Sequence, residues 1–149
     1  MDSVEHMQRL CEQHGVRLTS KRSLVLCALM RSDKALSAYE LVDRCNSEFG
    51  SEILANSVYR ILDFLEGKHL VHKLGLVNKY VACAHVGRAQ QHPLSQFLIC
   101  VKCQRVEEIC IEAQRETALR RDMHEAGFHL LSPQLEFNGV CERCMHESL

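Results

Sequence analysis

Two short stretches, CVKC at residues 100–103 and CERC at residues 141–144, place four cysteines in two pairs near the C-terminal end. The two-residue spacer lets both sulfurs of a pair face one ion, and two pairs supply the four thiolates of a closed tetrahedral zinc site. The 37 residues between the pairs leave room for a strand, a helix and a return strand. We therefore predict a structural zinc site at Cys100, Cys103, Cys141 and Cys144, with thiol–disulfide chemistry as the alternative.

Composition bounds the size and class of the protein. The chain has 149 residues, a length that suits one ordinary domain or two small ones. Its apolar residues, 46% of the total, are enough for a core, although only 5% of all residues are aromatic. No run of about 18 apolar residues is present, and the N-terminal residues lack the basic and apolar regions of a signal peptide. Nine cysteines, an odd number, with paired Cys-x-x-Cys spacing favour metal binding over disulfides. We expect a cytoplasmic protein.

The charge balance gives no global attraction to nucleic acid. The net charge is −1, with +1 over residues 1–83 and −2 over residues 84–149. This balance by itself argues against a nucleic-acid partner. Any contact with DNA must therefore depend on a local basic cluster.

The first 67 residues are predicted to be helical. A capping box is expected where Ser37 precedes Glu40 by three residues, and Asn56 or Ser57 is expected to cap the last helix. Apolar residues in that last helix recur at the spacing of one buried stripe, and residues 24–30 are apolar all round, which predicts a central buried helix. The predicted helices cover residues 3–14, 20–31, 37–49 and about 56–66.

The apolar period then changes to that of strands. Residues 70–74 and 79–83 predict a hairpin, and helices followed by such a hairpin form a winged helix, a variant of helix-turn-helix. Gly, Pro and consecutive Gln mark residues 84–95 as a linker. Beyond it we expect strands at 97–101 and 105–109, a helix at 112–126 and a strand at 128–137.

The predicted fold class is α+β, in three parts. Residues 1–83 form a winged-helix DNA-binding domain, residues 84–95 a hinge linker, and residues 96–149 a small α/β dimerisation and metal-binding domain that contains the four-cysteine zinc site. An exposed strand edge in the last part would invite pairing with a second copy.

Several short motifs, taken together and in order, resemble the ferric uptake regulator family over nearly the whole chain. Within the family the chain looks most like the zinc uptake regulator branch, because the histidine-rich run before the first cysteine pair is replaced by Gln90-Gln-His-Pro93, and Cys83 ends the predicted wing. Besides the cysteine pairs, the motifs are Arg17-Leu-Thr-Ser-Lys-Arg22, Ser37-Ala-Tyr-Glu-Leu41, Ser57-Val-Tyr-Arg60, Leu70-Val-His-Lys73 and Asn78-Lys-Tyr80.

The resemblance implies a second, regulatory zinc site with the ligands His72, Cys83, His92 and Glu108. Two imidazoles, a thiolate and a carboxylate suit zinc better than an oxygen-rich set would, and the thiolate disfavours manganese. Each residue has an alternative role: His72 as a packing histidine, Cys83 as a small buried apolar residue, and Glu108 as a solvated carboxylate. His85 competes with His92 as a ligand.

The resemblance also implies DNA contacts. The helix at 56–66 would enter the major groove with Ser57, Tyr59 and Arg60 exposed, and arginine reads guanine through two hydrogen bonds. Tyr39 would contact a thymine methyl or a phosphate. The residues expected to hold phosphates are Arg17, Lys21 and Arg22.

The function that these features imply is that of a homodimeric, zinc-responsive transcriptional repressor and not an enzyme. It would bind about two zinc ions per chain, and a pseudo-palindromic DNA operator, and it would control zinc uptake genes. A regulator that senses iron or manganese is the near alternative. A zinc-dependent thiol oxidoreductase is the distant one.

Overall fold

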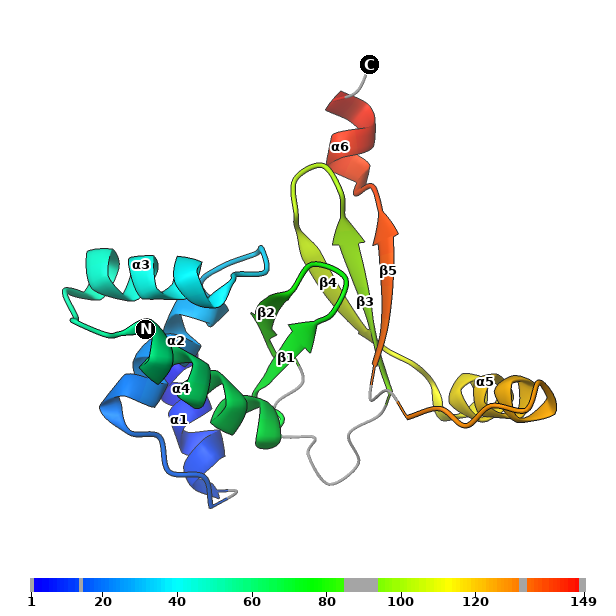
Figure 1. The fold of residues 1–149 in the computed structure, drawn as a ribbon, viewed down its shortest axis with the longest axis horizontal. Helices are drawn as coiled ribbons and strands as arrows, with labels where there is room; N and C mark the ends of the chain where they lie inside the picture. Colours follow the sequence, from blue (N-terminus) through cyan, green and yellow to red (C-terminus); the bar gives the residue numbers. More distant parts are fainter. Residues whose placement is uncertain (1, 14, 85–93, 132–133, 148–149) are drawn as a thin grey trace. The chain divides into compact units, whose positions relative to one another are not determined.

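The computed structural model describes residues 2–13, 15–84, 94–131 and 134–147. The chain divides into two compact units, Met1–Ala89 and Gln90–Leu149 (Figure 1). No helix among the described residues is both long and apolar enough to cross a membrane. The first unit is a winged helix, and the second is a small α/β unit, as the sequence predicted.

The described residues of the first unit form four helices and a two-stranded hairpin. Val25, Leu29, Leu41 and Leu62 are buried in one core to which α1 also contributes, and α2 carries a buried run of five residues at its centre. This confirms α2 as the central helix. The elements are α1 (Asp2–Gln13), α2 (Ser20–Met30), α3 (Ala38–Phe49), α4 (Ala55–Gly67), β1 (Val71–Leu74) and β2 (Lys79–Ala82).

The start of α3 is fixed by the predicted capping box. The backbone N–H of Glu40 donates to Ser37 Oγ at 3.1 Å, and the N–H of Ser37 donates to Glu40 Oε1 at 3.2 Å. These bonds satisfy two of the amides that a helix start leaves unpaired. Gly50 ends the helix in the left-handed conformation at φ 62°, which glycine adopts without steric cost.

We expect Ser37→Ala to lower the free energy of unfolding by about 1 kcal/mol, because it removes the acceptor for the Glu40 amide. Urea unfolding followed by circular dichroism measures the change. Ser47→Ala is the matched control, since Ser47 lies exposed within the same helix. Equal stability of the Ser37→Ala and Ser47→Ala variants would contradict the role of the capping box.

The predicted cap of α4 was wrong. The helix begins at Ala55, and its N-cap is Leu54, which makes no side-chain capping bond. Ile53, the residue before Leu54, determines this start instead, and it is buried. Its N–H donates to Asn46 Oδ1 at 3.0 Å, and its carbonyl accepts from Asn46 Nδ2 at 3.4 Å. These two hydrogen bonds to Asn46 in α3 fix where the chain enters α4.

The wing is tied to the segment before α3. Leu36 and Tyr80 exchange two backbone hydrogen bonds of 2.9 and 2.8 Å, which adds a short bridge to the hairpin. Lys79 Nζ lies 3.0 Å from Glu40 Oε1. Burial by itself raises the pKa of the Glu40 carboxyl, but the hydrogen bonds from Lys79 and Ser37 outweigh it and leave that pKa below its usual value.

The second unit is a three-stranded sheet of order β4-β3-β5, in which β3 pairs antiparallel with β4 and parallel with β5. The last strand begins later than predicted, at Gln134 and not at residue 128, because its ladder partners are the residues of β3. The short helix α6 was not predicted. The elements are β3 (Ser95–Cys100), β4 (Val106–Cys110), α5 (Ala113–Glu125), β5 (Gln134–Gly139) and α6 (Glu142–Glu147).

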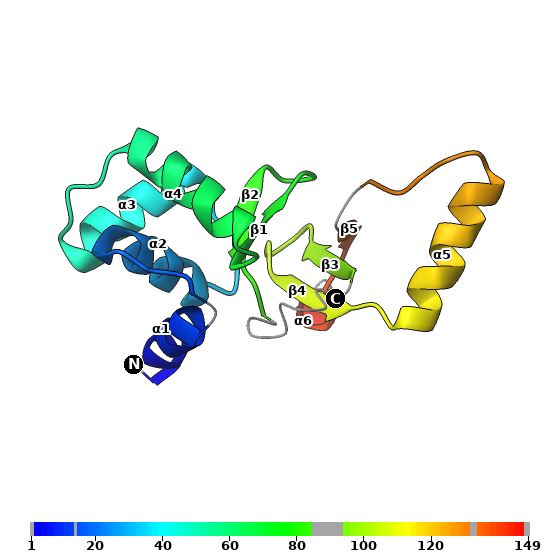
Figure 2. The ribbon, with the colours of Figure 1, turned by 90° about the horizontal axis from the view of Figure 1, so that it is seen from below.

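Two surfaces of the second unit are exposed among the residues that the structure describes. Helix α5 has no buried residue among its 13, and both views show it standing apart from the sheet (Figures 1 and 2). Leu98, Ile109 and Phe137 share one sheet face by register, and each is at least 40% exposed. Apolar surface of this kind marks an interaction site.

Candidate metal centres and nucleic-acid interface

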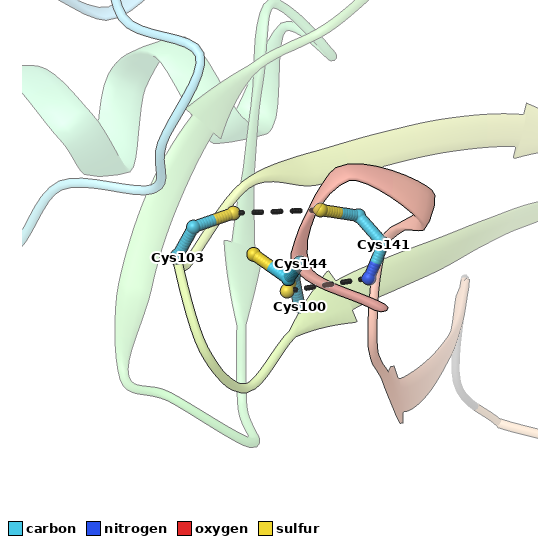
Figure 3. Close-up of side chains that lie close together, drawn as sticks. All are labelled: Cys100, Cys103, Cys141 and Cys144. Carbon is cyan, nitrogen blue, oxygen red and sulfur yellow. Dashed lines mark hydrogen bonds between the residues drawn. The ribbon is translucent and has the colours of Figure 1, made fainter. Parts of the chain in front are cut away.

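The four predicted cysteines gather at one end of the second unit. Cys100 ends β3, Cys103 lies in the turn to β4, Cys141 immediately precedes α6, and Cys144 lies inside that helix. Each offers a sulfur within 4.8 Å of the other three, and the four side chains point toward one another (Figure 3). The structure therefore brings together all four residues.

Backbone geometry holds this cluster in place. The N–H of Cys100 donates to the carbonyl of Arg105 at 2.9 Å, and the N–H of Gln104 donates to the carbonyl of Cys100 at 2.9 Å, so the first pair closes a tight turn. Gln104 adopts φ 67°, a left-handed conformation that costs a non-glycine residue free energy. The N–H of Cys141 donates to Cys100 Sγ at 3.3 Å, which joins the two pairs (Figure 3).

The sulfur spacing fits a zinc ion. Cys103 Sγ and Cys141 Sγ lie 3.8 Å apart, too far for a disulfide. Zinc–thiolate bonds of about 2.3 Å at tetrahedral angles place two sulfurs about 3.8 Å apart. The observed separation therefore matches an edge of the tetrahedron that a structural zinc requires.

The thiols differ in acidity because they share one small site. Hydrogen bonds from the backbone amides of Cys103 and Cys141 lower the pKa of Cys100 to about 6. Hydrogen bonding to the Cys141 side chain, then burial, raise the pKa of Cys144 to about 12. Four thiolates at this spacing repel one another, so full ionisation requires a cation among them.

In the first unit, the wing brings together His72 and Cys83. Val71 pairs with Ala82 across the hairpin, and the N–H of Cys83 donates to the carbonyl of Leu70 at 2.8 Å. A ring nitrogen of His72 and the sulfur of Cys83 consequently lie within 4.8 Å of each other. Their exposed fractions are 7% and 5%. An imidazole and a thiol at this distance offer zinc two of its preferred ligand types.

In the second unit, Glu108 lies on β4. Its Oε1 accepts a hydrogen bond of 2.9 Å from Ser95 Oγ, and Ser95 is fully buried. Its neighbour Glu107 points to the other face of the strand, where it pairs with Arg105. Sequence reasoning missed Ser95 because the side-chain bond spans 13 residues and becomes visible only with the strand register. A bond of this kind orients a ligating carboxylate.

The other two histidines that the sequence singled out, His92 and His85, lie outside the described residues. The choice between them stays a prediction.

The predicted contact residues on α3 and α4 form one exposed aromatic surface. Tyr39 and Tyr59 are 66% and 43% exposed, and their rings meet edge to face with centroids 6.4 Å apart. Arg60 follows Tyr59 in α4 and is exposed, and Ser57 is half-buried. The two aromatic rings and the Arg60 guanidinium are therefore accessible to a ligand.

The basic residues predicted to hold phosphates divide into two groups. Arg17 and Lys21 are exposed, whereas Arg22 is half-buried. The Arg22 guanidinium lies over the ring of Phe64 in α4, 3.5 Å from its centroid. Phe64 was not singled out in the sequence, although its spacing of four residues from Arg60 places both on one face of the helix.

Comparison with known proteins adds independent information. The ferric uptake regulator family model matches residues 13–138. The zinc uptake regulation protein of Escherichia coli (strain K12) is 36% identical over 138 residues, which cover 93% of this chain and 78% of that protein. The ferric uptake regulation protein of Legionella pneumophila is 29% identical over 143 residues, 95% of this chain and 99% of that protein.

Solved structures similar to this chain include zinc uptake regulators as well. A zinc uptake regulator complexed with zinc and DNA is similar with a TM-score of 0.83 at 32% identity, over 99% of this chain and 95% of that one. The crystal structure of holo XcZur is similar with a TM-score of 0.81 at 34% identity, over 97% and 98%. The family model covers residues 13–138, most of the chain, so the chain belongs to the ferric uptake regulator family.

Proposed function

We propose that this protein is a zinc-responsive transcriptional repressor that binds a pseudo-palindromic DNA operator as a homodimer and controls zinc uptake genes. The observation that carries the proposal is the buried pair of His72 and Cys83 on the wing of a winged helix. Zinc bound by these two wing residues would act directly on the unit that would bind DNA. The relatives named for zinc uptake regulation, at 36% identity, support zinc over iron or manganese.

The regulatory zinc would be held by His72, Cys83, Glu108 and a histidine of the connecting segment, His92 or His85. His72, Cys83 and His85 belong to the first unit, and His92 and Glu108 belong to the second. A shared ion would therefore restrict how the units move relative to each other. To raise the binding-competent fraction from about 1% to about 99%, zinc must favour that state by about 5.5 kcal/mol. Four metal–ligand bonds can supply this difference.

A second zinc would occupy the four-cysteine cluster, so the protein would hold about two zinc ions per chain. The first pair lies between β3 and β4 and the second at α6, so this ion would join the ends of the sheet to the last helix. Four thiolate ligands leave no open coordination position for water or substrate. We therefore assign the cluster to holding the fold and propose no catalytic role for the protein.

A second copy of the chain would cover the exposed surfaces of the second unit. The apolar face of Leu98, Ile109 and Phe137 and the unpacked helix α5 together favour a dimer in which these elements pack on the partner. Such a dimer places two α4 helices for half-sites about one DNA turn apart or a multiple of it. Reduced thiols and a DNA target suit the cytoplasm.

We expect Arg60→Ala to weaken operator binding by about 1–3 kcal/mol, because arginine in the major groove reads guanine through two hydrogen bonds. Fluorescence anisotropy with a duplex selected on the zinc-loaded protein measures the loss. Arg9→Ala is the control, because it removes the same charge from an exposed position on α1. Equal losses for the two variants would show a general charge effect and contradict base reading by Arg60.

Metal titration of DNA binding tests the function as a whole. Chelator-treated protein that retains the cysteine-bound zinc is titrated with buffered Zn(II), Fe(II) or Mn(II) in the presence of the selected duplex. We expect zinc to activate binding at the lowest free concentration. Activation by iron at lower free concentration would assign the protein to iron sensing, and duplex binding that no metal affects would overturn the proposal.

A further inference from the structure

The Arg22 side chain contacts two segments of the first unit, the one before α2 and helix α4. Its guanidinium lies 3.5 Å from the centroid of the Phe64 ring in α4. Its Nη1 donates to the carbonyl oxygen of Arg17 at 3.2 Å, and its backbone N–H donates to Thr19 Oγ1 at 3.3 Å. One residue thus ties the segment before α2 to the second half of α4.

These contacts use one face of the Arg22 guanidinium and one of its N–H donors. A guanidinium stacked on a ring uses one of its two faces, and the bond to Arg17 uses one end of its donor fork. The side chain is half-buried, whereas Arg17 and Lys21 are exposed. Arg22 is therefore less available to a DNA backbone than either neighbour.

The tied segments are the ones that carry the proposed DNA contacts. Phe64 follows Arg60 by one helical turn, so the stacked guanidinium lies along the face of α4 that presents Arg60. The carbonyl that Arg22 holds belongs to Arg17, an expected phosphate contact. The Arg22 side chain thus links the segment that carries Arg17 to the helix that carries Arg60.

We propose that Arg22 is a positioning residue that sets Arg17 relative to the base-reading Arg60 by stacking on Phe64, and that it is not itself a phosphate contact. This inference rests on the proposed DNA binding. It replaces the role that the sequence suggested for Arg22, and it adds Phe64, an uncharged residue, to the determinants of operator affinity.

The two roles predict different behaviour for conservative variants. Lysine keeps the charge that a phosphate contact needs, but it lacks the flat guanidinium that stacks on a ring. Leucine at position 64 keeps an apolar side chain but removes the aromatic face. If Arg22 positions Arg17, each of the variants Arg22→Lys and Phe64→Leu should weaken the affinity of the zinc-loaded protein for the duplex about fivefold. The double variant should lose no more than either single one.

Anisotropy titrations with the selected duplex measure these affinities, at a temperature where circular dichroism shows every variant folded. Lys21→Gln is the control for an exposed cation. It should weaken DNA binding and reduce the slope of log affinity against log salt concentration by about 0.9. Its loss of binding free energy should add to that of Phe64→Leu. Retention of full affinity by Arg22→Lys, or by Phe64→Leu, would overturn the positioning role. Failure of the unmodified protein to bind the duplex would instead overturn the proposed function.

Discussion

Replacing Cys141 with serine is expected to remove the zinc of the four-cysteine cluster and to unfold the end of the second unit. Cys141 Sγ lies 3.8 Å from Cys103 Sγ, and its N–H donates to Cys100 Sγ, so this residue belongs to the metal tetrahedron and also joins the two cysteine pairs. Structural zinc sites contribute apparent binding free energies of about 10–16 kcal/mol in zinc-finger peptides, and that energy is also folding energy. A small sheet with few large side chains has little else to replace it.

The measurements are zinc content by atomic spectroscopy, far-ultraviolet circular dichroism, and molar mass by light scattering. We expect zinc to fall from about two to at most about one per chain, with loss of the dimer. Cys110→Ser is the matched control, because Cys110 is half-buried at the end of β4 and lies outside the cluster. A Cys141→Ser protein that keeps both its zinc and its dimer would contradict the structural role of the site.

Replacing Cys83 with serine should have a different effect, which distinguishes the two metal sites. We expect zinc to fall from about two to about one per chain while the dimer stays intact, because the four-cysteine cluster keeps its own ion. Operator affinity should fall by about 100-fold, which corresponds to a competent fraction that drops from about 99% to about 1%. Zinc analysis, light scattering and anisotropy on one preparation test all three expectations.

Adjacent carboxylates on β4 supply a stringent control for this second site. Glu108→Gln keeps the shape of the side chain but removes the anionic ligand, so it should weaken zinc-dependent DNA binding as Cys83→Ser does. Glu107→Gln makes the same change one residue away, on the opposite strand face where Glu107 pairs with Arg105. It should leave unchanged the free zinc concentration that half-activates DNA binding, although Glu107 shares the sheet face proposed to meet the second copy. Equal effects of the two glutamine variants would contradict a ligand role for Glu108.

Elements defined by local rules were predicted closely. The capping box of Ser37 and Glu40 and the hairpin over 70–83 depend on neighbours within a few residues, so sequence spacing alone indicated them. The predictions failed where a distant residue determines the outcome. The start of α4 depends on the contact between Asn46 and Ile53, and the start of β5 depends on its register with β3.

The same division applies to the candidate sites. The four-cysteine cluster was predictable because the two-residue spacer lets both sulfurs of a pair bind one ion, and two such pairs supply the four ligands of a tetrahedral zinc site. The contact of Ser95 with Glu108 was not, since the two residues are far apart along the chain. Nor was the stack of Arg22 on Phe64, which needs the packing of α2 against α4.

Most of the helices and strands, the two cysteine pairs and the family could be read from the sequence, because periodicity, capping and ligand spacing depend on residues close together in the chain; the short helix α6 could not. The folded structure was needed to show which of two chemically similar side chains faces which partner: Glu108 faces Ser95 and Glu107 faces Arg105, whereas Arg17 faces solvent and Arg22 faces Phe64. The reason is that strand register and helix packing assign faces, and a shift of one residue along a strand reverses them.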